Sequence, residues 1–263
     1  MKLVDFFHTI QGEGHYAGTL ATFIRFPDCN LFCGLDKPLP KTITEHRRAV
    51  PYTPSQKQIN KMKSKDATWV CDTMEQWRQS GKEYNAEDIA EKIEQNYDHS
   101  NYHVVFTGGE PLLHKDWIEE LITNIDKLKH PPSKYEIETN GTIMPIESER
   151  IAYNVSVKLS DSGIPKNIRI HNNVLAKYFE LENSMEIYWK FVVNRIEDVY
   201  EALILFPKEN YVLRRDHVYL MPGAYSQKEA IENSKLVVEF CKRAGLNYSP
   251  RLQVFIYDRT VGV

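Results

Sequence analysis

The sequence predicts an α/β protein built on a mostly parallel sheet. Short runs rich in β-branched and aromatic residues alternate along the chain with longer amphipathic segments, as expected for repeated strand–helix units. The composition agrees with this fold class. A chain of 263 residues, with 42% hydrophobic and 26% charged residues, can bury a substantial core in one large domain or two small ones.

Six segments have the character of strands, because they are short, rich in β-branched and aromatic residues and bounded by turn residues. In chain order they span 20–26, 102–109, 134–141, 152–159, 186–193 and 216–223. Four segments repeat apolar residues at helical spacing, and they span 85–96, 115–128, 196–206 and 227–243. Cys241 lies on the apolar side of the last of these helices, so we interpret it as a core residue.

Four polar or glycine-containing segments fall at or just after predicted strand ends: TGGEP, ETNGT, VKLS and LMPG. In parallel sheets and barrels, functional residues gather at the carboxyl ends of the strands. We therefore expect one mouth of the fold to collect all four segments.

Residues 37–66 interrupt the alternation. The segment is rich in proline and basic residues and shows no clear apolar period. Connections of this length inside a compact domain are usually functional excursions or disordered loops. We interpret it as an insertion within a single domain spanning 1–263, either simply solvated or, given its charge, close to a negatively charged substrate or partner.

The overall charge and the absence of long apolar runs limit the class of protein. A formal net charge of −3 gives no global reason to expect nucleic acid or an anionic membrane as the main partner. No apolar run approaches the roughly 20 residues of a membrane span, and the first residues lack a secretory-signal pattern. The sequence predicts a cytoplasmic protein that acts on a small molecule, with no membrane and no direct nucleic-acid partner.

Excising the insertion brings Cys29, Cys33 and Cys71 into one group. In a reducing compartment, such a group is more often a metal or redox site than a set of disulfides. Thiolates select zinc or iron–sulfur clusters. Three cysteines without a fourth ligand leave one metal position open, and in an iron–sulfur cluster an open iron can bind an exogenous ligand. A zinc site and free core thiols are the alternatives.

Several motifs, taken together and in order, resemble the 7-carboxy-7-deazaguanine synthase family of radical S-adenosylmethionine enzymes. They are TIQGEG, CNLFC, WVCDT, GGEP, ETNGT and the ending SPRLQVFIYDRTVGV, which looks like that family's C-terminal strand and tail. The resemblance runs in pieces from about residue 5 to the C-terminus, excluding the insertion. It implies a radical S-adenosylmethionine core, a partial (β/α)6-type TIM barrel with reduced helices and a long insertion in the cluster-binding loop.

The resemblance implies that Cys29, Cys33 and Cys71 hold a [4Fe-4S] cluster whose unique iron binds the amino and carboxylate groups of S-adenosylmethionine. It also assigns contacts with this cofactor to residues at the strand ends: Gly108, Gly109, Glu110, Glu138, Thr139, Asn140, Ser156, Lys158, Met221 and Pro222. The two glycines would let backbone approach a ligand, and the Glu110 carboxylate would accept from an ammonium group. Each residue also has a plainer interpretation as turn chemistry or, for Lys158, as a surface lysine.

Substrate contacts follow from the same resemblance. Gln11, Glu13 and Gly14 would bind the pterin ring of 6-carboxy-5,6,7,8-tetrahydropterin, because a Gln and a Glu offer donors and acceptors to a guanidine-like edge. Arg25 lies inside an apolar run and needs a partner when buried. That partner is either the substrate carboxylate or an acidic side chain of the protein itself.

The implied reaction starts with hydrogen-atom abstraction from C6 of the tetrahydropterin and continues by ring contraction and loss of ammonia to 7-carboxy-7-deazaguanine. Asp72 and Thr73 offer hard oxygen ligands suited to magnesium, with Thr73 the direct ligand in the family. Magnesium would bind the substrate carboxylate as template and Lewis acid. No side chain is expected to act as a conventional acid or base. The product would serve queuosine synthesis or a deazaguanine modification of DNA.

Four features depart from the family pattern. The third cysteine of the usual C-x3-C-x2-C would fall at Asp36, and Trp69 lies two residues before Cys71 instead of adjacent to it. Val157 replaces the proline of an S-P-K segment, and Gln253 stands in the C-terminal strand where some relatives carry histidine. These departures concern substrate contacts more than the class of reaction. Gln253 is therefore retained as a substrate-binding candidate.

Two other functions would explain part of the sequence. A radical enzyme that activates a glycyl-radical partner would need the cysteines and GGEP but has less reason to carry QGEG and Arg25. A zinc-binding interaction module would explain the cysteines and the basic segment but not the strand-end motifs. For the favoured function we expect an electron donor such as flavodoxin or ferredoxin, and a homodimer.

Overall fold

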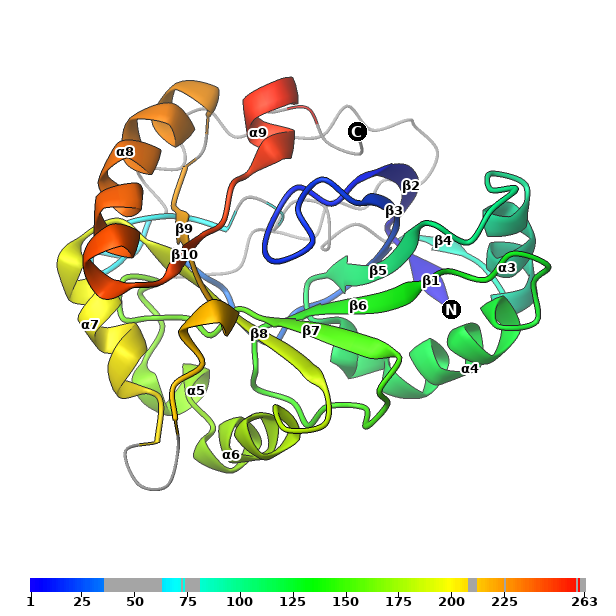
Figure 1. Cartoon of the computed structure of the whole chain (residues 1–263), viewed down its shortest axis with the longest axis horizontal. Helices are drawn as coiled ribbons and strands as arrows, with labels where there is room; N and C mark the ends of the chain where they lie inside the picture. The colour runs from blue at the N-terminus through cyan, green and yellow to red at the C-terminus, as the bar shows by residue number, and fades with distance from the viewer. Residues whose placement is uncertain are drawn as a thin grey trace.

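Eight strands form one curved sheet at the centre of the described chain (Figure 1). The structure is a computed structural model that describes residues 1–35, 63–71, 73, 81–207, 212–224, 226–258 and 260. The strand order is β10-β9-β8-β7-β6-β5-β3-β2, and every neighbouring pair is parallel except β2 and β3. From β2 onward the bounds are Asp5–Ile10, Leu20–Phe26 (β3), His103–Gly108 (β5), Lys134–Thr139 (β6), Ile151–Val155 (β7), Glu186–Val193 (β8), Val218–Pro222 (β9) and Asn247–Tyr248 (β10).

Helices surround the outer side of this sheet (Figure 1). They are α3 (Ala86–Glu94), α4 (Lys115–Ile125), α5 (Lys166–Arg169), α6 (Asn172–Leu181), α7 (Ile196–Ile204) and α8 (Gln227–Ala244), with short 3-10 turns η1 (Pro111–His114) and η2 (Arg215–His217). Helix α9 (Leu252–Tyr257) instead lies near the loop between β2 and β3 (Figure 1). A separate two-stranded ladder pairs β1 (Lys2–Leu3) with β4 (Lys82–Glu83). In the described residues, no helix is both long and apolar enough to cross a membrane.

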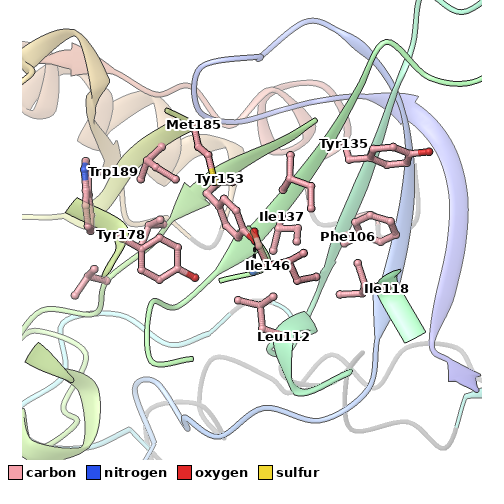
Figure 2. Close-up of a cluster of buried hydrophobic side chains, with 14 of the residues drawn as sticks. Phe106, Leu112, Ile118, Tyr135, Ile137, Ile146, Tyr153, Tyr178, Met185 and Trp189 are labelled. Atoms are coloured by element: carbon pink, nitrogen blue, oxygen red, sulfur yellow. Dashed lines mark hydrogen bonds between the residues drawn. The ribbon is translucent and has the colours of Figure 1, made fainter. Parts of the chain in front are cut away.

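The main core lies between the sheet and the surrounding helices. Figure 2 shows part of it, with Ile137 of β6 and Tyr153 of β7 packed among side chains from η1, α4 and α6. Because successive strand residues point to opposite faces, every second residue of each strand enters this core. The intervening residues form the opposite, inner face of the sheet, and many of them are polar.

The sheet does not close on itself, since β2 and β10 are its two edges. The loop between β2 and β3 and the C-terminal segment are joined across this side of the molecule. Leu252 donates its backbone N–H to the Gly12 carbonyl (3.0 Å), and Gly14 donates to Ser249 Oγ (2.8 Å). The architecture is a partial barrel whose open side is bridged by two segments far apart in sequence.

The six strands predicted from the sequence are confirmed as the parallel run from β3 to β9, and the four predicted helices are confirmed as α3, α4, α7 and α8. Cys241 is confirmed as a core residue of α8. The prediction of a C-terminal strand was wrong, because Leu252–Tyr257 form helix α9. The segment has apolar residues in a run too short to distinguish strand from helix.

Candidate active site

The two ends of the predicted insertion lie side by side. Leu35 and Lys63 form an antiparallel bridge, and Cys71 then donates its backbone N–H to the Cys33 carbonyl at 3.1 Å. Of the predicted segment 37–66, only residues 63–66 are among the described ones. The bridge therefore brings the third cysteine next to the first two, as the sequence predicted.

The three thiols share one environment at the end of β3. Cys29 and Cys71 both pack against Leu35, while Cys33 is buried. Burial raises the pKa of Cys29 to about 12, opposed by the backbone N–H of Leu31 and the positive charge of Lys158 and reinforced by Cys71 and Glu110. Burial raises the pKa of Cys33 as well. Neutral thiols of this kind must release their protons to solvent when they bind a metal, because the thiolate is the ligand.

The donor set fits an iron–sulfur cluster better than a finished metal site. Three soft thiols with a cation beside them suit an anionic thiolate-bound cluster. Within the described ranges, however, no three His, Cys, Asp or Glu side chains converge into a ready metal-binding group. The cysteines are neighbours whose final ligand geometry would be set when the cluster binds.

The GGEP segment after β5 is bound tightly to the cysteine loop. Gly108 has φ of 132°, and a Cβ on either Gly108 or Gly109 would collide with the backbone between Phe26 and Asp28. Glu110 donates its backbone N–H to the Asp28 carbonyl at 2.9 Å. The missing Cβ atoms thus allow close approach of the chain to itself. Contacts of the two glycines with a cofactor stay predictions.

Glu110 joins the ends of β5 and β6. Its fully buried carboxylate accepts from the backbone N–H of Leu112 (3.1 Å), from Thr139 Oγ1 (2.9 Å) and from the backbone N–H of Asn140 (2.7 Å). Burial raises its pKa to about 7, although these hydrogen bonds partly oppose the increase. Both oxygens are engaged with the protein, so Glu110 has an architectural role whether or not it also contacts a ligand.

Asn140 connects the β6 end to the cysteine loop. Its side chain donates to Asn30 Oδ1 (2.8 Å) and more weakly to Cys29 Sγ (4.0 Å), and its Oδ1 accepts from Thr142. Asn30 in turn donates to Thr142 Oγ1 (2.7 Å). The Asn-Gly-Thr turn therefore supports the loop that carries the first cysteines.

Lys158 lies close to the thiols after β7. Its ammonium group donates to Ser156 Oγ at 2.8 Å and lies 6.0 Å from the centre of the Trp69 ring. Arg169 holds the backbone carbonyl of Lys158 (2.9 Å) and pairs with Glu201 (2.7 Å). Lys158 is half-buried, and its contact with a cofactor stays a prediction.

Met221 and Pro222 end β9 and are buried. The next residue, Gly223, packs against Asn194 after β8, whose Nδ2 donates to Thr68 Oγ1 at 3.0 Å. Thr68 precedes the third cysteine by three residues. All four predicted strand-end segments thus lie around one mouth, as expected. Asn194, which also contributes to it, was not among the residues selected from the sequence.

Thr73 lies beside the cysteines, with its Oγ1 3.5 Å from Cys71 Sγ. Asp72, the other predicted magnesium ligand, is outside the described residues. The magnesium assignment of both residues stays a prediction.

The QGEG loop lies on the inner face of the sheet. Gln11 is buried, donates to Glu136 Oε2 (3.1 Å) and accepts from the Glu13 backbone (3.1 Å). Gly14 approaches Asn154 so closely that a Cβ would contact Asn154 Oδ1 at 2.8 Å. The loop is therefore fixed by the strands beneath it.

Glu13 is the centre of a charged network. Its carboxylate accepts from Lys190 Nζ (2.7 Å), Gln253 Nε2 (2.6 Å) and Arg251 Nε (3.3 Å). Burial alone would raise its pKa, but the charges of Lys190 and Arg251, with the hydrogen bonds from Lys190 and Gln253, lower the pKa of Glu13 to about 2. Glu13 is thus firmly ionised, and Gln253 from α9 is one of its partners.

Sequence reasoning missed the floor beneath this loop. Fully buried Glu136 accepts from His103 Nδ1 (2.8 Å), Asn154 Nδ2 (2.9 Å) and Gln11. Glu138, which the resemblance assigns to the cofactor, lies beside Glu136 on the same face and accepts from Thr107 Oγ1 (2.6 Å). Its contact with the cofactor stays a prediction. The signal was present in the strand sequence KYEIET, where charged residues occupy every second position of an otherwise apolar run.

Arg25 lies near the carboxyl end of β3. It is only 8% exposed, its Nε has no hydrogen-bond partner among the described residues, and its guanidinium lies 5.9 Å from the centre of the Phe7 ring. The ion pairs found among the described residues do not include Arg25. Asp5 lies opposite Arg25 in the register of β2 and β3, and burial raises the pKa of Asp5 against the smaller, opposite effect of the Arg25 charge. An unpartnered buried N–H is suited to an incoming carboxylate.

Comparison with known proteins supports the resemblance seen in the sequence. The chain is 25% identical to a 7-carboxy-7-deazaguanine synthase of Hyperthermus butylicus, with 97% of this chain and 92% of that protein covered. It is 27% identical to one of Pyrobaculum aerophilum, with 100% and 97% covered. No family model matches the sequence. The structure resembles the crystal structure of QueE from Escherichia coli, with a TM-score of 0.55, 21% identity, and 94% and 92% of the chains covered. The predicted fold, a partial barrel built on a mostly parallel sheet, is confirmed.

Proposed function

We propose that this chain, which resembles the 7-carboxy-7-deazaguanine synthases over nearly its whole length, catalyses their reaction. It is a radical S-adenosylmethionine lyase that converts 6-carboxy-5,6,7,8-tetrahydropterin to 7-carboxy-7-deazaguanine and ammonia. The atoms of the substrate are all accounted for by these two products, so the overall conversion is redox-neutral. The reaction belongs to 7-deazaguanine synthesis.

One observation carries the proposal most directly: the mouth with three thiols lies at the carboxyl ends of strands whose inner face carries a charged floor. The thiols of Cys29, Cys33 and Cys71 would hold the [4Fe-4S] cluster. With S-adenosylmethionine, the cluster supplies one-electron chemistry that starts the rearrangement. The protein's own task is to place a polar, flat substrate between this cofactor and the floor.

The residues on the inner face of the sheet and in the QGEG loop suit a pterin that carries a carboxylate. The ionised Glu13 can accept N–H groups from the pyrimidine edge of the ring, and Arg25 can receive the carboxylate. Gln11 and Gly14 shape the loop through their contacts with Glu136 and Asn154. Binding at both ends of the substrate fixes C6 relative to the mouth.

Other parts of the proposal rest on the sequence resemblance. Thr73 and Asp72 bind magnesium, which orients the substrate carboxylate. The ten strand-end residues named from the sequence, the first of which is Gly108 and the last Pro222, surround S-adenosylmethionine. An external protein such as flavodoxin or ferredoxin supplies the electron, and two chains form a homodimer. Neither the glycyl-radical-activating function nor the zinc module explains the charged floor, so neither is favoured.

The test is anaerobic reconstitution with iron and sulfide, followed by incubation with reductant, S-adenosylmethionine, magnesium and 6-carboxytetrahydropterin. Mass spectrometry should detect 7-carboxy-7-deazaguanine. Cys71→Ala should remove both the brown colour and the product, whereas the matched control Cys241→Ala, in α8, should retain them. A cluster-bearing protein that cleaves S-adenosylmethionine but forms no product would redirect the proposal to another radical substrate, and a colourless zinc protein would refute it.

A further inference from the structure

A buried lysine on the inner face links two carboxylates. Lys190, in the middle of β8, is only 4% exposed, and its Nζ lies 2.7 Å from Glu13 Oε2 and 3.8 Å from Glu138 Oε1. An ammonium group this deeply buried is costly unless it is paired. Lys190 was not among the residues singled out from the sequence.

The balance of charge around Glu13 depends on Lys190. The groups that face Glu13 are Lys190 from β8, Arg251 and Gln253 at the start of α9, and Glu138 of β6 through Lys190. Glu13 thus pairs with two cations, one of which, Lys190, it shares with Glu138. Without Lys190, Arg251 would be the one remaining cation paired with Glu13 among the described residues, and its Nε is the more distant partner at 3.3 Å.

We propose that Lys190 is a specificity-determining positioning residue, which keeps Glu13 ionised and oriented to bind the amidine-like edge of the pterin ring. This inference rests on the proposed function. Arg251 and Gln253 donate to Oε1 of Glu13 and Lys190 donates to Oε2, which leaves one acceptor position on Oε2 for an N–H of a 2-amino-4-oxopyrimidine. A carboxylic acid would carry its own proton at this position and could not accept there. Lys190 therefore favours substrates that present an N–H donor at this edge.

The direction of the pKa values agrees with this role. The neighbouring carboxylates raise the pKa of Lys190 despite the opposing effect of burial, and the pKa of Glu13 is lowered to about 2. Removing the Lys190 charge would leave the desolvation of Glu13 less opposed, so its pKa would rise toward the neutral range. Pterin binding would then weaken as the pH falls.

The test compares Lys190→Met and Lys190→Arg with the control Lys134→Met. Lys134 is also a strand lysine paired with a carboxylate, Glu186 at 2.9 Å, but it does not contact Glu13. Binding of 6-carboxytetrahydropterin to cluster-loaded protein would be measured by anaerobic calorimetry from pH 5 to pH 8. In parallel, carbon-13 NMR would follow the ionisation of Glu13 in each protein.

Lys190→Met should weaken binding by roughly 10- to 100-fold, as expected for a lost charged hydrogen bond, with a larger loss at pH 5 than at pH 8. Lys190→Arg should restore most of the affinity, and Lys134→Met should bind normally. Glu13→Gln should show a similar loss that does not vary with pH, and it gives a reading if Lys190→Met does not fold.

Equal affinity of Lys190→Met and the wild type at every pH would overturn the inference, as would a loss that is independent of pH and not rescued by Arg. Affinity for the pterin that is unchanged in Glu13→Gln would also overturn it. Failure of the proposed function looks different. The wild-type protein would then bind no pterin, although the NMR titration of Glu13 would still respond to Lys190→Met.

Discussion

The two faces of the central sheet are made by the same strands but have opposite chemistry. In β6, Tyr135 and Ile137 enter the apolar core under the helices, while Glu136 and Glu138 lie on the inner face among hydrogen-bond donors. In β8, Trp189 packs in the core next to Lys190 on the inner face. Alternate residues of one strand therefore serve different purposes: those on the helix-covered face stabilise the fold, and those on the inner face are available for recognition. Substitutions at adjacent positions should accordingly affect either stability or ligand binding.

The largest effect on stability is expected on the helix-covered side. Ile137→Ala removes a fully buried side chain and should lower the free energy of unfolding by about 2–5 kcal/mol. Urea denaturation would measure the loss. Because Ile137 does not face the floor, pterin binding by the folded fraction should be unchanged, and a large rise in its dissociation constant would contradict the separation of the two faces.

The ionisation of Glu110 with rising pH should have a somewhat smaller effect on the free energy of unfolding. The folded-state pKa of Glu110 is raised from 4.5 to about 7, so its contribution is fully present below about pH 4.5 and is lost as the pH rises through 7. The loss attributable to this group should be about 3 kcal/mol or less. The unfolding free energy at pH 5 and pH 8 would be compared between the wild type and Glu110→Gln.

The difference in unfolding free energy between the wild type and Glu110→Gln should depend on pH between pH 5 and pH 8, because the amide side chain introduced by the substitution cannot titrate. A wild-type protein that gains stability relative to Glu110→Gln between pH 5 and pH 8 would contradict the assignment.

Glu13 should affect stability in the opposite direction. Its pKa is lowered to about 2, so its contribution is present above about pH 4.5 and is lost only as the pH falls toward 2.

The inner face should be less sensitive. Glu136→Gln replaces one carboxylate oxygen with an NH2 group, which would then face a hydrogen-bond donor of His103, Asn154 or Gln11. Because two donors cannot bond to each other, the free energy of unfolding should fall by about 1–3 kcal/mol. The QGEG loop should also lose its fixed position. Thermal denaturation and hydrogen exchange of residues 11–14 would measure the two effects, and unchanged exchange would show that Glu136 does not hold the loop.

The smallest effect on stability is expected at Arg25. Because its Nε has no partner, Arg25→Met should change the unfolding free energy by no more than about 0.5 kcal/mol. Affinity for 6-carboxytetrahydropterin should fall sharply, while affinity for a pterin without the carboxylate should not. A loss of several kcal/mol in stability would instead favour an internal salt bridge, the alternative left open by the sequence.

The sequence was sufficient for the parallel part of the fold. Strand periodicity located β3 and β8 at their observed bounds, because buried parallel strands are short apolar runs between turn residues. It missed β2, whose residues are only partly buried, and α6, which contains β-branched and aromatic residues with weak helix preference. It also assigned Leu252–Tyr257 to a strand, because six apolar and polar residues do not define a period.

The candidate site was predicted in part. Glycines, cysteines and Asn-Gly turns are visible as motifs, so the mouth could be assembled from strand ends. Glu136, Lys190 and Arg251 are ordinary charged residues in sequence, and their roles depend on contacts between positions more than 100 residues apart. Only the three-dimensional contacts of Gln11 with β6, and of Glu13 with β8 and the start of α9, identify them.

The bridge between Leu35 and Lys63 has a practical consequence. The cost of closing a loop grows slowly with its length, by about 0.6 kcal/mol for each doubling. Since the bridge fixes both ends of the intervening segment, its length can change with little effect on the cysteines. A fluorescent protein or affinity tag inserted at this position should therefore leave Cys71 beside Cys33, giving a reporter close to the mouth.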